Sequence, residues 1–182
     1  MNTKYIDLID QTYHFPQPEF NLKEDTLTFH DIDLMELVET YGAPLKFTYL
    51  PKISDNIQRA KQWFATAIDK NDYKGTYNYC YCTKSSHFKH VLNEALKNDI
   101  HIETSSAFDI DIVENLKAQG KITNETFVVC NGFKRDQYVK NIARLINSGH
   151  ENCIPVIDNY EELSLLSEEI STDFKVGIRI AS

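Results

Sequence analysis

The sequence has little glycine, proline or cysteine, and no long run of hydrophobic residues. Six glycines and five prolines among 182 residues exclude a collagen-like repeat and a low-complexity chain. Four cysteines do not make the dense pattern of a small disulfide scaffold. The first residues lack the apolar stretch of a secretory signal peptide, and no uncharged apolar run approaches the roughly 20 residues of a membrane-spanning helix. The composition is that of an ordinary globular protein.

Positive charge is also scarce. Lysine and arginine total 19 against 27 aspartates and glutamates, which gives a net charge of −8. An acidic surface repels nucleic-acid phosphates and anionic lipids, and no basic block offsets it. We therefore expect neither nucleic acid nor a membrane as a partner.

The four cysteines lie in apolar runs that are typical of strands: Cys80, Cys82, Cys130 and Cys153. This placement indicates reduced, buried thiols and a cytoplasmic protein. The C-x-C pair could contribute to a zinc site, but no second pair with ligand spacing follows, so no metal site is predicted.

From residue 44 onward, short β-rich runs alternate with helical patterns. The runs cover residues 44–50, 76–84, 100–106, 126–132, 153–158 and 174–182. Between them, apolar residues recur every three or four positions, and Gly120 and Gly149 are placed to end two of the helices. The alternation predicts βαβ units and a parallel sheet over 44–182. Residues 1–43 form a lead-in with a strand, a turn and a short helix ending at Gly42, and because no low-complexity linker follows, we expect it to pack on the same body.

Two α/β folds are built from such units, the open doubly wound sheet and the TIM barrel. Neither G-x-G-x-x-G nor a P-loop follows any strand, so the sequence lacks the motifs of the common nucleotide-binding open sheets. A complete (β/α)8 barrel takes about 250 residues and eight strands. Six strands are predicted here, and the residues alone leave a smaller open-sheet domain and a truncated barrel equally open.

Lys84 ends the run 76–84. Because strand side chains alternate, the tyrosines of this run share one face, while Cys80, Cys82 and Lys84 share the other. In a barrel, Lys84 would then point inward at the carboxyl end of its strand, where barrel active sites lie. A desolvated lysine there is a usable amine nucleophile. The alternative, which geometry alone favours, is a lysine that ends a strand in solvent.

Arg179, one of only four arginines, lies in the apolar run VGIRIAS. A buried arginine needs a partner, and either an anionic cofactor or a carboxylate such as Glu103 would serve. Glu103 itself precedes Ser105 and Ser106, one of which is predicted to cap the next helix together with Asp109.

Two other pairs of polar residues have ordinary explanations. Asn131 and Gly132 suit a tight turn between a strand and a helix. His87 and His90, three positions apart, could share a metal ion, but a solvated helix face is the favoured reading.

Three segments, taken in order, are more specific than any single motif: YCTKSSHFKHVLNEALKNDIHIETSSAFDIDIVENL, FVVCNGFK and VGIRIAS. Together they resemble the biosynthetic arginine decarboxylases, members of the alanine-racemase-like, fold-type III enzymes that use pyridoxal 5′-phosphate (PLP). DIDLMELVETYGAPLKFTYL also looks like the start of that family's barrel. CNGFK and VGIRIAS point to the arginine branch rather than to the ornithine or diaminopimelate decarboxylases.

The resemblance implies a PLP-binding barrel of which this chain supplies an N-terminal portion, without the C-terminal β-domain. Lys84 matches the lysine that holds PLP as a Schiff base, and Arg179 matches an arginine near the cofactor ring. Glu103 and Ser106 match polar positions that line the pocket. Asp109 stands where the family more usually has glutamate, so its role stays open.

The implied reaction is decarboxylation of a basic amino acid, above all L-arginine to agmatine and CO₂, in polyamine biosynthesis. The resemblance also implies a homo-oligomer and a possible Mg²⁺ requirement. The Gly-rich phosphate cradle and the acid that partners the pyridine nitrogen are missing, so we expect little turnover by this chain alone.

Three other functions stay open beside this one. The chain could be a noncatalytic PLP-binding or remnant domain, or belong to an ornithine- or diaminopimelate-type decarboxylase. It could also be an interaction or metal module that uses Cys80, Cys82, His87 and His90.

Overall fold

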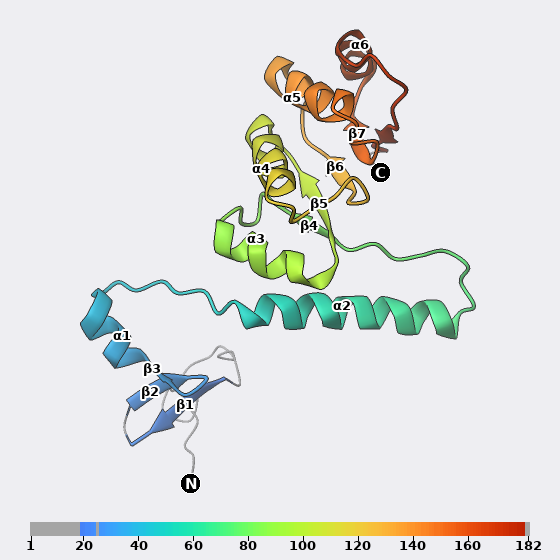
Figure 1. The fold of residues 1–182 in the computed structure, drawn as a ribbon. Helices are drawn as coiled ribbons and strands as arrows, with labels where there is room; N and C mark the ends of the chain where they lie inside the picture. The colour runs from blue at the N-terminus through green and yellow to red at the C-terminus, as the bar shows by residue number, and fades with distance from the viewer. Residues whose placement is uncertain (1–18, 25, 181–182) are drawn as a thin grey trace. The chain divides into compact units, whose positions relative to one another are not determined.

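A computed structural model describes residues 19–24 and 26–180. They fall into two compact units, one ending at Thr48 and one beginning at Tyr49 (Figure 1). No helix among these residues is long and apolar enough to cross a membrane.

The first unit is a small antiparallel sheet followed by a helix. Its elements are β1 (Phe20–Lys23), β2 (Thr26–Phe29), β3 (Ile32–Asp33) and α1 (Leu34–Tyr41), with β2 between β1 and β3. The Asp33 side chain starts α1 by accepting hydrogen bonds from the N–H groups of Met35 and Glu36, at 2.8 and 3.1 Å. Gly42 ends the helix with a φ of 84°, a value that favours glycine. The predicted strand, turn and short helix are confirmed here.

The strand predicted at 44–50 is not observed. A strand needs a neighbour to complete its hydrogen bonds, and no described strand pairs with this segment. Phe47 instead packs on Phe29 of the first unit, with 5.5 Å between ring centroids. The first unit therefore continues to Thr48, past the predicted boundary at residue 43, and the count of six sheet strands is wrong.

The second unit alternates strands and helices, as predicted. Its elements are α2 (Pro51–Lys70), β4 (Cys80–Cys82), α3 (Lys89–Ala95), the 3₁₀ turn η2 (Leu96–Asn98), β5 (His101–Thr104), α4 (Ala107–Ala118), β6 (Val128–Cys130), α5 (Asp136–Asn147), β7 (Cys153–Ile157), α6 (Tyr160–Glu169) and β8 (Gly177–Ile178). The five strands are all parallel and lie side by side in chain order, β4-β5-β6-β7-β8. The α/β class and the parallel sheet are confirmed.

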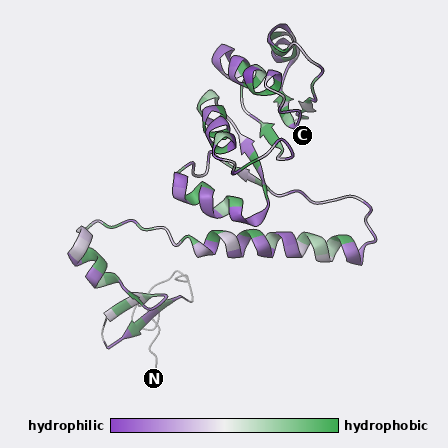
Figure 2. Cartoon of the chain, viewed as in Figure 1, coloured by the Kyte–Doolittle hydropathy of each residue, from purple (hydrophilic) through white to green (hydrophobic). Residues whose placement is uncertain are grey.

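The helices pack against one face of this sheet. Tyr81, Ile102 and Val128 are paired across the strands and so share that face. Ile102 and Val128 join a buried cluster with residues of α4, α5 and α6, while Tyr81 packs on a second cluster that includes Ile57 of α2 and Ala95 of α3. Figure 2 shows hydrophilic and hydrophobic residues alternating along α2, α4 and α5, the pattern of helices with one packed side.

The opposite face of the sheet is only half-buried. Cys82, Glu103, Val129 and Ile154 lie on it in a row across β4 to β7. The tyrosine face and the cysteine face of β4 thus point as the alternation predicts.

The four cysteines are free thiols, but they differ in burial. Cys130 and Cys153 lie in the core with their Sγ atoms 3.6 Å apart, whereas Cys80 and Cys82 are half-buried on the open face. The expectation that all four are buried is therefore wrong for the two on β4.

Candidate functional site

The carboxyl ends of the five parallel strands meet at one edge of the sheet, and all four predicted site residues lie there. We call this the carboxyl edge (residues 83–88, 103–106, 131–135, 158–159 and 179). Lys84 follows β4, Glu103 lies near the end of β5, Ser106 begins α4 and Arg179 follows β8. Ligands of parallel α/β sheets bind at this edge because the strand-to-helix turns gather there.

The turn that carries Lys84 is tied firmly to its neighbours. Ser85 donates from its backbone N–H and its hydroxyl to the carbonyl of Cys82, at 3.2 and 2.7 Å. The buried Thr83 donates from its N–H and hydroxyl to the carbonyl of Glu103, at 3.0 and 3.1 Å. The Lys84 side chain itself is exposed, so the desolvation expected for a strand-end nucleophile is not found in the described chain.

Both Lys84 and Glu103 lie close enough to Cys82 to change the pKa of its thiol. Burial raises the pKa of the Cys82 thiol, and the neighbouring Glu103 carboxyl raises it further. The backbone N–H and the charge of Lys84 oppose that rise. The amine-bearing turn and the carboxylate are therefore neighbours, as the side-by-side pairing of β4 and β5 requires.

Glu103 is half-buried and is held by Asn131 from the next strand-to-helix turn. The Asn131 side-chain amide donates to the Glu103 carboxylate at 2.9 Å, and its backbone N–H donates to the Thr104 carbonyl at 2.8 Å. Asn131 therefore orients a predicted site residue as well as forming the predicted turn.

Gly132 is required where two of these turns meet. It has a φ of 80°, and a Cβ atom there would lie 2.6 Å from the carbonyl oxygen of Ser105. Any other residue would push the turn after β6 away from the turn after β5.

Ser106 is confirmed as the N-cap of α4. Its hydroxyl accepts from the Asp109 N–H at 3.4 Å and donates to the Asp109 carboxylate at 3.0 Å. The same carboxylate oxygen accepts from the Ser105 N–H at 3.0 Å, and Asp109 is buried. The hydroxyl therefore has a structural role, and its role toward a cofactor stays a prediction.

Arg179 is placed differently from what its apolar run suggests. Its backbone N–H donates to the Ile157 carbonyl at 3.0 Å, and its side chain is 57% exposed. Its guanidinium Nε lies 3.6 Å from the Asp158 carboxylate. The expected burial of Arg179 and its pairing with Glu103 are thus wrong: the carboxylate beside Arg179 is Asp158, while Glu103 is bonded to Asn131, and contact with a cofactor stays a prediction.

Sequence reasoning missed a buried ion pair at the carboxyl edge. Lys134 and Glu162 lie within 3.6 Å of each other, with side chains 0% and 6% exposed. They are 28 residues apart, Lys134 in the turn after β6 and Glu162 in the first turn of α6, and no local pattern links them. A lysine just before a helix and a glutamate in a helical first turn each look like ordinary surface residues in sequence.

The histidine and cysteine residues do not form a metal centre in the described part of the chain. His87 packs against the ring of Phe108 with 5.7 Å between centroids, and His90 stacks on Phe88. Among residues 19–24 and 26–180, no three His, Cys, Asp or Glu side chains gather in a metal-binding arrangement.

The donor set of the carboxyl edge fits PLP. Lys84 offers a primary amine to an aldehyde, Glu103 offers a fixed carboxylate on the adjacent strand, and Arg179 offers a cation to an anionic group. Arg179 also lines a pocket of about 230 Å³ at the ends of β7 and β8, together with Asp158 and Tyr160.

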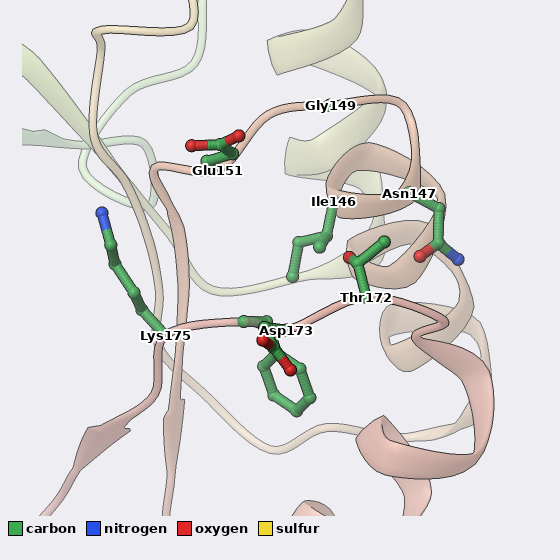
Figure 3. Close-up of a pocket in the computed structure, with 8 residues that line it drawn as sticks. Ile146, Asn147, Gly149, Glu151, Thr172, Asp173 and Lys175 are labelled. Atoms are coloured by element: carbon green, nitrogen blue, oxygen red, sulfur yellow. The ribbon is translucent and has the colours of Figure 1, made fainter.

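A larger pocket, of about 520 Å³, lies at the other edge of the sheet. It is bounded by the end of α5 and by the segments that lead into β7 and β8 (Figure 3). Its polar lining includes Asn147, Glu151, Asp173 and Lys175. None of the predicted site residues lines it, so it is separate from the carboxyl edge.

The comparisons with known proteins agree with the resemblance carried by the motifs. No family model matches the sequence. The chain is 28% identical over 159 residues to the biosynthetic arginine decarboxylase of Gloeobacter violaceus, covering 82% of this chain and 23% of that protein. It is 26% identical over 165 residues to biosynthetic arginine decarboxylase 2 of Synechocystis, covering 81% and 25%. The chain thus spans about a quarter of the length of these relatives, which fits an N-terminal portion of the family.

A solved structure has a similar fold. The biosynthetic arginine decarboxylase SpeA from Campylobacter jejuni matches 88% of this chain and 28% of its own with a TM-score of 0.63, at 20% sequence identity. The similarity to biosynthetic arginine decarboxylases is confirmed.

Proposed function

We propose that this chain is the cofactor-lysine portion of a PLP-dependent arginine decarboxylase. The observation that carries the proposal is the position of Lys84, in a tightly bonded turn at the carboxyl edge beside Glu103. The relatives named arginine decarboxylase support the reaction and the substrate. The parent reaction is the conversion of L-arginine to agmatine and CO₂, and we place it in polyamine biosynthesis in the cytoplasm.

We also propose that the five-stranded sheet is part of a (β/α)8 barrel. The strands follow one another in chain order, and the helices pack on one face, whereas a doubly wound sheet carries helices on both. The half-buried face with Cys82, Glu103 and Val129 would then be the barrel interior. Further barrel strands, and a second subunit in a homo-oligomer, would cover this face and desolvate Lys84.

Each residue of the edge has a task in this scheme. Lys84 would hold the cofactor aldehyde through its amine. Glu103, oriented by Asn131, would hold a proton or a compensating charge beside the ring. Arg179 would attract an anionic group, and Asp158 fixes its guanidinium. When bound, PLP supplies the electron sink that loss of CO₂ requires. Magnesium has no role in this proposal.

The activity test uses the natural gene product, supplied with PLP. It should release CO₂ from L-arginine and form agmatine in equal amounts, with little release from ornithine or diaminopimelate. Lys84→Ala should reduce the rate to background, and Lys97→Ala, a surface change on η2, should leave it unchanged. Absence of CO₂ release from all three amino acids would contradict the proposal.

The exposure of Lys84 favours a second candidate, a noncatalytic PLP-binding domain. The same assay separates the two functions. A natural product that binds PLP through Lys84 but decarboxylates nothing would establish the noncatalytic function.

A further inference from the structure

The buried pair of Lys134 and Glu162 contacts the backbone of two neighbouring segments. The Lys134 ammonium lies 3.6 Å from Glu162, donates to the Gly132 carbonyl at 2.8 Å, and donates to the Val156 carbonyl. Two of the three ammonium donors are used in hydrogen bonds to backbone carbonyls, and the Glu162 carboxylate compensates the charge. The pair therefore joins the turn after β6 to strand β7.

Glu162 joins the same turn to the turn after β7. One carboxylate oxygen accepts from the Lys134 N–H and the other accepts from the Asp158 N–H, both at 3.0 Å. Glu162 is itself held by Asn159, the N-cap of α6, whose side chain accepts from the Glu162 N–H at 2.9 Å. The carboxylate is thus fixed in the first turn of α6 by both of its oxygens.

The two turns joined in this way carry the partners of two predicted site residues. The turn after β6 contains Asn131, which holds Glu103 at 2.9 Å. The turn after β7 contains Asp158, which lies 3.6 Å from Arg179. A continuous series of contacts therefore runs from Glu103 to Arg179, with the buried pair at its centre.

Stability alone does not account for such a pair. The cost of removing two charges from water often equals or exceeds their attraction, and well-packed apolar residues are frequently as good. What an ion pair with fixed hydrogen bonds adds is a single geometry. Here that geometry sets the separation of the turns after β6 and β7.

We propose that Lys134 and Glu162 are positioning residues, which hold Asn131 and Asp158 so that Glu103 and Arg179 face the cofactor. This inference rests on the proposed function, because it gives the carboxyl edge its cofactor. Neither residue is expected to touch the cofactor, since both side chains are buried beneath the edge.

The test compares Lys134→Met, Glu162→Gln and the double variant with Lys97→Met in the 182-residue chain. Lys97 forms an ion pair with Glu94 on the surface, away from the edge, so it is a matched control. The double variant removes both charges and avoids leaving one of them buried alone. The first readout is the NMR signal of the Asn131 side-chain amide and of the Arg179 Nε–H, recorded without PLP.

We expect both signals to move in the three pair variants and to stay in place in Lys97→Met. PLP labelling of Lys84 is trapped with borohydride. At saturating PLP, we expect its rate to stay within about twofold of the wild-type rate. The PLP concentration that gives half-labelling should rise about tenfold or more. A loss of stability alone would expose every lysine to PLP and remove the preference for Lys84, without a separate shift in the PLP concentration for half-labelling of Lys84. Unchanged Asn131 and Arg179 signals in folded variants would overturn the inference.

Two further results distinguish failure of this inference from failure of the proposed function. If the variants do not fold, hydrogen exchange of the wild-type chain tests the inference instead. The backbone amides of Lys134 and Asp158 should then be protected, because both donate to Glu162. Exchange of these amides at the rate of free amides would overturn the inference. If wild-type Lys84 takes no PLP label, the proposed function fails, whereas the NMR signals still show whether the pair positions the edge.

Discussion

At the scale of single residues, His150 is a buried ionisable group outside the carboxyl edge. It is fully buried, and its Nε2 lies 2.9 Å from the Thr126 carbonyl, so Nε2 carries the proton. Its Nδ1 has no hydrogen-bond partner within the described part of the chain. Burial lowers the pKa of His150, and the charge of Lys117 lowers it further, while the bond to Thr126 acts in the opposite direction. The folded protein therefore holds this imidazole neutral.

This residue should make the second unit sensitive to acid. In the unfolded chain a histidine binds a proton near pH 6.5, whereas folded His150 does so only at lower pH. The unfolded state thus binds more protons in that window, and the free energy of unfolding falls as the pH drops from about 7.5 toward 5.5, by at most about 1.4 kcal/mol per pH unit. His150→Gln, whose amide can still donate to Thr126, should flatten this dependence in urea titrations.

The control is His90→Gln, a change at an exposed position on α3. His101, whose pKa burial also lowers, remains in both variants and contributes equally to each. Equal pH slopes for wild type and His150→Gln would show that His150 does not determine the acid response.

At the scale of elements, α4 depends on the cap formed by Ser106 and Asp109. Ser106→Ala removes one N-cap acceptor and one of the two donors to the buried Asp109 carboxylate, so that only the Ser105 N–H still donates to it. The free energy of unfolding should fall by about 1–2 kcal/mol, measured by urea denaturation. Ser106→Thr keeps the hydroxyl and should recover most of the loss. If Ser106→Ala is as stable as wild type, the cap is not formed in solution.

Element positions were largely predictable from the sequence, and the reasons are local. Apolar periodicity located the helices α2 to α6, and the serine–aspartate spacing located the start of α4. The run 44–50 looked like a strand because its residues favour extended backbone, but a strand also needs a partner along its edge, and composition does not reveal one. Of the predicted run 76–84, only β4 (Cys80–Cys82) forms a strand, because only these residues pair with β5.

At the scale of the whole molecule, long-range pairs escaped prediction. The parallel sheet follows from the strand–helix alternation, and Lys84 was expected at the carboxyl end of its strand. Which site residues meet was not predictable. Arg179 lies beside Asp158, Glu103 bonds to Asn131, and Lys134 bonds to Glu162 across 28 residues of chain. Such pairs are set by strand order and turn geometry, neither of which leaves a local pattern.

The most direct test of the central claim is to map where PLP attaches. The 182-residue chain contains 15 lysines. After incubation with PLP and reduction with borohydride, peptide masses should show the pyridoxyl group concentrated on the peptide that carries Lys84. In Lys84→Met that label should disappear without moving to another lysine. Label spread over the exposed lysines, with no preference for Lys84, would contradict the claim that Lys84 is the cofactor lysine of this edge.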